Sequence, residues 1–336
     1  MGAVDSPTDL ELRDGVSGRR LDQRLERLAA GHPSSPDYPD RQLLVREAAD
    51  VADEDGDADR VRPYSDAEHA EHVAEVEVRL DDARAAGLST DLQHTVDEER
   101  EVWTDEREVL HDAIVADLYA RASEVPCEGK AILAGGLPGA GKTTVLNEFV
   151  GVDLSRYLMI NPDLIKAEMA RRGLIPIVDG LTPMEASDLA HEESSHIAKR
   201  LASRAEGDGK NVIWDITMST TRSIAERVES LRAAGYSQVD GLFVDIPVEV
   251  SIRRAEARHR EAHDDFRAGQ GFGGRHVPEA TILKNADAEW GSGNRRNFEQ
   301  LKSAFDAWSR YDNSVDDRDP VLVESLGRPG TDRERR

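Results

Sequence analysis

The stretch Gly136-Leu137-Pro138-Gly139-Ala140-Gly141-Lys142-Thr143 decides how the rest of this chain is interpreted. It matches G-x-x-x-x-G-K-[ST] at every fixed position, the pattern of a loop that binds phosphate groups. The apolar run 131–134 precedes it and suits a buried parallel strand, and 144–150 continues as a helix. Because this pattern requires a strand before it and a helix after it, a chance glycine-rich turn is a poor explanation.

Each residue type in this loop has a chemical reason. Glycines let successive N–H groups point at phosphate oxygens, and the following helix presents its positive end to them. Lys142 is expected to reach the β- and γ-phosphates of ATP, and the Thr143 hydroxyl to ligate Mg²⁺. The predicted cofactors are therefore ATP and Mg²⁺. The predicted ATP contacts in the loop are Gly136, Pro138, Gly139, Ala140, Gly141, Lys142, Thr143 and Thr144.

The composition limits the class of protein. The 336 residues carry a net charge of −24, which disfavours a nucleic-acid binder and docking on an anionic membrane. There is no apolar run near the roughly 18 residues that a membrane span needs, and Met1–Leu10 does not resemble a secretory signal. The single cysteine, Cys127, cannot form an intrachain disulfide. We expect a cytoplasmic protein.

Acidic residues concentrate at the start of the chain, where 33 acidic and 14 basic residues precede residue 126. The segment Ala49–Asp59 is expected to be disordered, because it is self-repelling and poor in apolar residues. A short helix is predicted over Leu21–Leu28. Ser65 and Glu68 form a capping-box pattern that begins a helix ended by Gly87. Another helix follows Thr104, and its apolar side is predicted to pack on the next domain.

Acidic residues also follow three further predicted strands, at the sheet edge where open parallel sheets bind ligands. After the strand 157–160, Asp163 is either a general base for a substrate hydroxyl or the N-cap of a helix over 164–172. After 211–214, Asp215 is predicted to contact Mg²⁺ through water, or the substrate. Asp245 follows the third of these strands, and capping of the next helix is its preferred interpretation.

Two segments could supply groups to an acceptor and to the transferred phosphate. One long helix is predicted over 183–206, with Glu192 on a face that either binds substrate or is solvated. The segment 251–260 (SIRRAEARHR) is rich in arginine, and a glycine-rich stretch follows it. We predict a lid whose arginines stabilise the phosphoryl group, against the alternative of ordinary pairing with neighbouring acids. The predicted lid arginines are Arg254, which contacts ATP, Arg258 and Arg275.

Taken in order, these motifs resemble the zeta-toxin family of P-loop kinases. The resemblance rests on Gly136–Thr143, Ile160–Asp163, Thr217 after an acid-ended strand, and Gly274–Pro278, and runs from about residue 103 to 314. It implies a central parallel sheet flanked by helices. It implies phosphorylation of the 3′-hydroxyl of UDP-N-acetylglucosamine, with the catalytic roles at Lys142, Asp163, Arg258 and Arg275.

One departure bears on the substrate. The family's third-strand motif ends with an acid, Gly, Thr, Gly and Arg, whereas residues 215–219 read Asp-Ile-Thr-Met-Ser. The arginine expected to hold substrate phosphates is Ser219 here, and Arg222 is its predicted substitute. The predicted substrate contacts are Asp163, Glu192, Asp215, Thr217 and Arg222, and the predicted metal ligands are Thr143 and Asp215.

The sequence thus predicts an acidic helical and partly disordered extension (1–95), a kinase domain (96–325) and a flexible tail (326–336). The extension is either a tail with a packing helix, which we prefer, or a restraint on the kinase. An antitoxin protein is an expected partner, since the family's toxins are often so restrained. Two other functions stay open: a kinase of another nucleotide or of a polynucleotide end, and a nucleotide-binding regulator without turnover.

Overall fold

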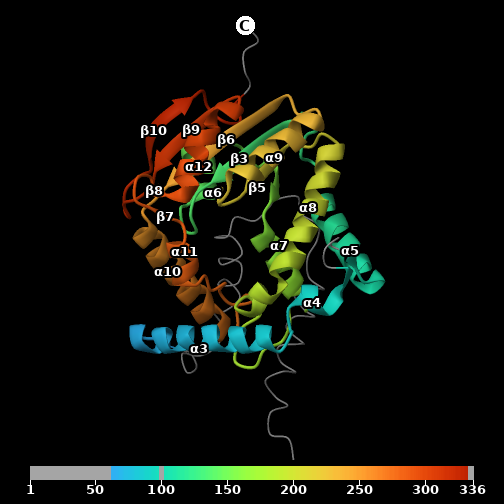
Figure 1. Cartoon of the computed structure of the whole chain (residues 1–336), viewed down its shortest axis with the longest axis vertical. Helices are drawn as coiled ribbons and strands as arrows, with labels where there is room; N and C mark the ends of the chain where they lie inside the picture. The colour runs from blue at the N-terminus through green and yellow to red at the C-terminus, as the bar shows by residue number, and fades with distance from the viewer. Residues whose placement is uncertain (1–61, 98–101, 332–336) are drawn as a thin grey trace, which may run out of the picture. The chain divides into compact units, whose positions relative to one another are not determined.

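A six-stranded sheet forms the centre of the computed structural model, which describes residues 62–97 and 102–331 (Figure 1). Its strand order is β10-β9-β6-β3-β5-β4, with β10 antiparallel to its neighbour and the other strands parallel. The expected parallel sheet flanked by helices is confirmed, with an antiparallel edge strand added. The strands are β3 (Lys130–Gly135), β4 (Leu158–Ile160), β5 (Val212–Asp215), β6 (Gln238–Asp245), β9 (Trp308–Asp312) and β10 (Val321–Leu326).

The strand β3 shows why this sheet is buried on both sides. Successive side chains of a strand point to opposite faces, so Leu133 packs into one apolar core and Ile132 into another. The first core lies against α5, α7, α8, α9 and α12, and the second against α6, α10 and α11. These helices are α5 (Asp105–Arg121), α6 (Lys142–Thr144), α7 (Pro162–Arg171), α8 (His191–Gly207), α9 (Thr221–Ala233), α10 (Val248–Arg267), α11 (Glu279–Leu283) and α12 (Gly293–Leu301).

Smaller elements complete the described chain. The helix α4 (Thr90–His94) precedes a two-stranded sheet of β1 (Thr95–Asp97) and β2 (Val102–Trp103), and β7 (Ala286–Asp287) pairs with β8 (Gly291–Ser292). A π-helical segment continues α6 over Val145–Val150, and short 3₁₀ turns occupy Leu154–Arg156, Ala186–Ala190 and Lys302–Ala304. Within residues 62–97 and 102–331, we find no helix long and apolar enough to cross a bilayer.

The helix α3 (Asp66–Ala85) confirms the capping-box prediction. The Ser65 side chain accepts a hydrogen bond from the Glu68 N–H, and the Glu68 carboxylate accepts one from the Ser65 N–H. Gly87, with φ +72°, follows the end of the helix. The predicted helix 21–28 and the acidic segment 49–59 lie outside the described residues.

The helix α3 packs on elements that follow it by more than 90 residues. Its buried side chains, Val76 and Leu80, contact Leu189. Its Arg84 pairs with Asp188 at 2.6 Å, and Arg260 of α10 pairs with Asp66 at 2.5 Å. The described part of the N-terminal region therefore forms a packing helix, as expected.

Three sequence predictions are changed by the structure. The predicted helix 183–206 is wrong in its first two turns, because Thr182 and Glu185 bond reciprocally in a tight turn and a 3₁₀ segment follows, so that α8 begins at His191. Asp245 does not cap α10; it pairs with Arg295 (3.2 Å) and Arg310 (3.4 Å). The strands β9 and β10 were not predicted.

The expected start of the tail falls on the last residue of β10. Beyond it, Arg328 donates to the Val150 carbonyl at 2.5 Å, and the Gly330 N–H donates to Asp240 at 2.8 Å. These bonds hold the chain against the second core as far as residue 331.

A buried ion pair joins α5 to α8. Arg107 lies 2.5 Å from the Glu193 carboxylate, which also receives His111 at 2.7 Å. Burial raises the pKa of Glu193, but the bonds from His111 and Arg107 outweigh it and bring that pKa to about 2. A pair this deep is costly to break from one side, because the remaining charge is left without a partner.

Glu193→Gln should lower the free energy of unfolding by about 3–5 kcal/mol. Because the folded-state pKa of Glu193 is depressed, its contribution is present above pH 4.5 and is lost as the pH falls towards about 2. Urea unfolding at neutral and acidic pH measures both effects. Glu226→Gln, at an exposed pair with Arg222, is the control, with a change below about 0.5 kcal/mol. Equal losses in the two variants would contradict the assignment.

Candidate active site

The loop 136–141 has the backbone that its glycines predict. Gly136, Gly139 and Gly141 have φ values of +142°, +74° and +80°, where other residues are strained. There is also no room for a side chain, since a Cβ on Gly136 would lie 2.4 Å from the Val244 carbonyl oxygen. The loop leads from β3 into α6, which begins at Lys142. The strand–loop–helix prediction is confirmed.

A chain of polar contacts joins the ends of three strands. Lys142 Nζ lies 3.2 Å from Asp215 Oδ1 at the end of β5, and Asp215 Oδ2 accepts from Asn161 Nδ2 at 2.8 Å. Asn161 follows β4, and its Oδ1 accepts from the Asp163 N–H at 2.7 Å. The residues predicted after different strands therefore meet at one edge of the sheet.

Asn161, and not Asp163, is the N-cap of α7. The interpretation of Asp163 as the cap is wrong, because Pro162 is already the first helical residue and its φ suits that position. The Asp163 carboxylate is instead free of backbone duty and lies 2.5 Å from Arg275 Nη1 through both oxygens. The predicted base and a predicted lid arginine are thus in direct contact.

The charges around Asp163 keep it ionised. Burial alone would raise its pKa, but the nearby cations Arg275 and Lys166, with a smaller effect from Arg258, bring the pKa below the usual value. An ionised carboxylate whose side chain is 40% exposed can accept a hydrogen bond from a substrate hydroxyl. In this structure Arg275 occupies that position.

Lys166 is a site residue that sequence reasoning missed. It lies one turn after Asp163 on α7, is 1% exposed, and its Nζ has no hydrogen-bond partner. Burial and the neighbouring Arg275 lower its pKa to about 8, although Asp163, Asp188 and Glu192 oppose this. The signal in the sequence was the i, i+3 spacing from Asp163, which puts both side chains on one face of a helix.

The helix α10 brings the arginine-rich segment to the phosphate loop. Arg254 donates to the Gly139 carbonyl at 3.2 Å and pairs with Asp316 at 2.8 Å. Ser251 donates to the Pro138 carbonyl at 2.7 Å. Arg258 lies on the same helix and acts on the charge of Asp163. The predicted lid segment is therefore a regular helix that is already seated on the loop.

The remaining predicted contacts divide into two groups. Glu192 lies near Lys166 and contributes to its charge environment, and the exposed Thr143 lies on the first turn after the loop. The Thr217 carbonyl accepts from Asn294 at 2.7 Å, in the segment that follows β5. Arg222 points away: its side chain is 87% exposed and pairs with Glu226 at 2.6 Å.

Met218 occupies a backbone conformation that glycine would take without strain. Its φ is +60°, which is uncommon for any residue with a side chain. The side chain is buried against Gly135, where a Cβ would lie 2.3 Å from the Met218 sulfur. This position corresponds to the second glycine of the family motif, so the chain keeps the turn and fills it with a thioether.

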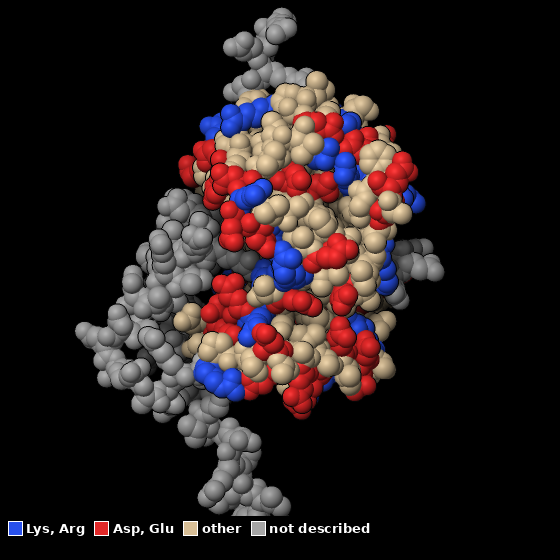
Figure 2. Space-filling view, turned by 90° about the vertical axis from the view of Figure 1, so that its left-hand side faces the viewer, with Lys and Arg blue, Asp and Glu red and all other residues tan. Residues whose placement is uncertain are grey.

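Oxygen donors that suit Mg²⁺ are present at the same edge. Mg²⁺ prefers hydroxyl, carboxylate and phosphate oxygens, and Thr143 and Asp215 offer the first two next to the phosphate loop. On the face seen in Figure 2, acidic and basic side chains of the described residues are interspersed. A basic surface suited to nucleic acid is not visible on that face.

A glycine loop, its lysine, acids at neighbouring strand ends and a seated arginine helix define a P-loop nucleotide kinase. A model of the Zeta toxin family matches residues 117–310, and the chain belongs to that family. Among curated proteins, none matches it.

Solved structures share the fold. Two are complexes of AvrRxo1-ORF1 with AvrRxo1-ORF2, one with sulphate ions (17% identity, TM-score 0.51) and one with ATP (18% identity, TM-score 0.50). They cover 67% and 66% of this chain and 69% and 68% of their own. A third belongs to the PezAT toxin–antitoxin system of Streptococcus pneumoniae, with 19% identity, a TM-score of 0.44, and coverage of 66% and 82%.

Gly136→Ala should weaken ATP binding at least tenfold, because the new Cβ would meet the Val244 carbonyl and displace the loop. Calorimetric titration with a non-hydrolysable ATP analogue measures this. Gly207→Ala is the control, since no atom lies within 4 Å of its Cβ position at the end of α8. Wild-type affinity in Gly136→Ala would show that the loop does not hold phosphate.

Proposed function

We propose that the protein transfers the γ-phosphate of ATP to a hydroxyl of a nucleotide sugar, with the 3′-hydroxyl of UDP-N-acetylglucosamine as the first candidate. The observation that carries the proposal is the position of Asp163, an ionised carboxylate one polar chain away from the phosphate-loop lysine. A binding module or a switch needs no such base beside cationic groups.

The residues have distinct tasks in this proposal. The loop N–H groups and Lys142 hold the β- and γ-phosphates, and Arg254 and Arg258 face the same loop from α10. Thr143 and Asp215 would hold Mg²⁺, which neutralises phosphate charge when bound. Asp163 accepts the proton of the acceptor hydroxyl and orients its oxygen towards the γ-phosphate.

Arg275 must leave Asp163 before the reaction. In the present geometry the guanidinium contacts both oxygens of the carboxylate, so a substrate hydroxyl cannot reach them. The transferring phosphoryl group carries negative charge that attracts the same guanidinium. Arg275 would thus exchange one anion for another, which frees the base when ATP is in place.

Lys166 is proposed to bind the diphosphate of the acceptor. The sequence lacks the family arginine at Ser219, and the predicted substitute, Arg222, is directed to solvent. Lys166 is a buried cation without a hydrogen-bond partner beside Asp163. A cation of this kind gains most from an anionic ligand that reaches it.

The other functions stay as alternatives. A kinase of a dinucleotide cofactor would use the same groups, and an assay with several acceptors separates it from the first candidate. ATP as donor is supported by the family and by the ATP that the AvrRxo1-ORF1:-ORF2 structure contains. We also propose the division into 1–95, 96–325 and 326–336, and an antitoxin partner, which family membership supports.

ATP consumption with UDP-N-acetylglucosamine, with a dinucleotide and with no acceptor is the first test. We expect turnover that depends on the nucleotide sugar and is absent in Lys142→Ala. Turnover only with the dinucleotide would replace the substrate but keep the reaction class. ATP binding without turnover on any acceptor would favour the regulator.

Asp163→Asn should lower kcat by a factor of about 10²–10⁴ while ATP affinity and melting temperature stay near the wild-type values. The fold is unaffected because Asn161 provides the cap. Asp153→Asn, on a 3₁₀ turn outside the site, is the matched control. A stable Asp163→Asn enzyme with the wild-type rate would remove the base assignment.

Acceptor binding should depend on the charge of Lys166. Because its pKa is lowered to about 8, the lysine is protonated below that pH and loses its charge above it. The KM for the nucleotide sugar should therefore rise as the pH passes 8, with little change in the KM for ATP. Lys166→Met should show a high KM for the sugar at every pH. An unchanged pH profile in Lys166→Met would mean that Lys166 only fills space.

A further inference from the structure

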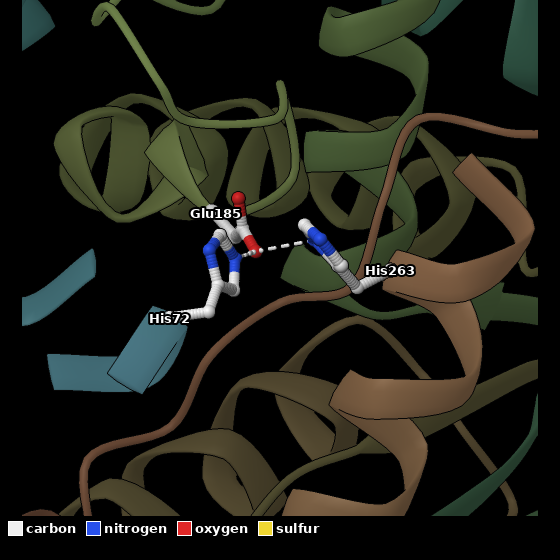
Figure 3. Close-up of side chains that lie close together, drawn as sticks. All are labelled: His72, Glu185 and His263. Carbon is white, nitrogen blue, oxygen red and sulfur yellow. Dashed lines mark hydrogen bonds and ion pairs between the residues drawn. The ribbon is translucent and has the colours of Figure 1, made fainter. Parts of the chain in front are cut away.

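A cluster of imidazoles surrounds one carboxylate oxygen where α3 meets α10. Glu185 Oε1 lies 2.7 Å from His72 Nε2, 3.0 Å from His263 Nδ1 and 3.0 Å from His259 Nε2. Figure 3 shows His72 and His263, from α3 and α10, converging on Glu185. We call these four residues the α3–α10 histidine cluster.

The cluster is almost sealed from solvent. The side chains of Glu185, His263 and His72 are 0%, 7% and 10% exposed. Glu185 Oε2 accepts from the Thr182 N–H at 2.8 Å, which fixes the carboxylate in the turn before α8. The second ring nitrogen of His263 is buried and has no hydrogen-bond partner. Four titratable groups thus share a volume that water does not fill freely.

Hydrogen bonding alone explains this arrangement poorly. One carboxylate oxygen has two lone pairs, yet three ring nitrogens lie within 3.0 Å of Glu185 Oε1. The nitrogens of His72 and His263 and this oxygen all lie within 4.8 Å of one another. In a tetrahedral Zn²⁺ site with bonds of about 2.0–2.1 Å, ligand atoms are separated by roughly 3.3 Å. The cluster is close to that spacing.

A second group of similar composition serves as a comparison. Glu108, His111 and His196 also lie within metal-ligand reach. Glu108 already pairs with the Arg200 guanidinium at 2.5 Å, and His111 bonds Glu193 at 2.7 Å. Its anion and one of its imidazoles therefore have partners, whereas the anion of the α3–α10 cluster faces imidazoles.

We propose that His72, His263 and Glu185 bind a divalent transition-metal ion, Zn²⁺ in the first place, which fastens α3 to α10. Two imidazoles and a carboxylate are ligands that Zn²⁺ accepts in tetrahedral geometry. His259 lies next to the same carboxylate and holds it in place, as partners of metal ligands commonly do. Water completes the coordination.

The ion would join segments that are distant in the sequence. His72 belongs to the N-terminal helix, Glu185 to the turn before α8, and His263 to the helix whose other end contacts the phosphate loop. This site is separate from the phosphate loop, and it does not depend on the proposed kinase reaction.

The first test uses the full chain without an affinity tag, stripped of metal and titrated with Zn²⁺ and Co²⁺. We expect one strongly bound equivalent and the visible absorption of tetrahedral Co²⁺. The melting temperature should rise by about 5–10 °C at a hundredfold excess of Zn²⁺ over its Kd. The absence of a bound equivalent in the wild-type protein would overturn the proposal.

Variants locate the ion. Glu185→Gln and His72→Asn should each weaken Zn²⁺ binding at least tenfold and remove the Co²⁺ absorption. His196→Asn, in the comparison group, should leave both unchanged. Loss of binding in His196→Asn but not in His72→Asn would move the site to the other group and overturn the assignment.

X-ray absorption of the Zn²⁺-loaded wild-type protein keeps the test independent of how the variants fold. The expected spectrum has nitrogen and oxygen ligands at about 2.0–2.1 Å, with scattering from two imidazoles. A spectrum with sulfur, or without imidazole scattering, would contradict the proposed ligands. Neither measurement uses kinase activity, so a failed kinase assay leaves this result intact.

Discussion

The arrangement of the candidate site depends on the contacts of Asp215 with Lys142 and Asn161. These three residues follow or begin elements on adjacent strands, so their bonds fix the relative positions of β3, β4 and β5 at the ligand-binding edge. Asn161 then uses its other amide atom to begin α7. The helix places Asp163 and Lys166 on one face, and the acceptor side of the site is thereby set by the same contacts that hold the phosphate lysine.

The parts of this structure that the sequence predicts are those with local causes. The phosphate loop follows from glycine conformations over eight residues, and α3 from the capping box at Ser65 and Glu68. The convergence of Lys142, Asp163 and Asp215 follows from a general property of parallel sheets. In these cases a short segment, or the direction of a strand, contains the necessary information.

The parts that the sequence does not predict arise from contacts between distant segments. The turn before α8 depends on a bond between Thr182 and Glu185, and Glu185 is held in turn by histidines 113 and 78 positions away. Lys166 has the composition of a solvated lysine and is buried only because other segments cover it. The role of Asp245 was misjudged because its arginine partners come from α12 and β9.

The helix α10 contacts the phosphate loop near its first turn and α3 near its last. Its 20 residues form one continuous rod of about 30 Å, so its two ends cannot reorient independently. A ligand that prefers one orientation of the rod at the loop changes the free energy of the contacts at α3, and by thermodynamic linkage the reverse holds to the same extent. The N-terminal helix is therefore energetically coupled to nucleotide occupancy without touching the nucleotide.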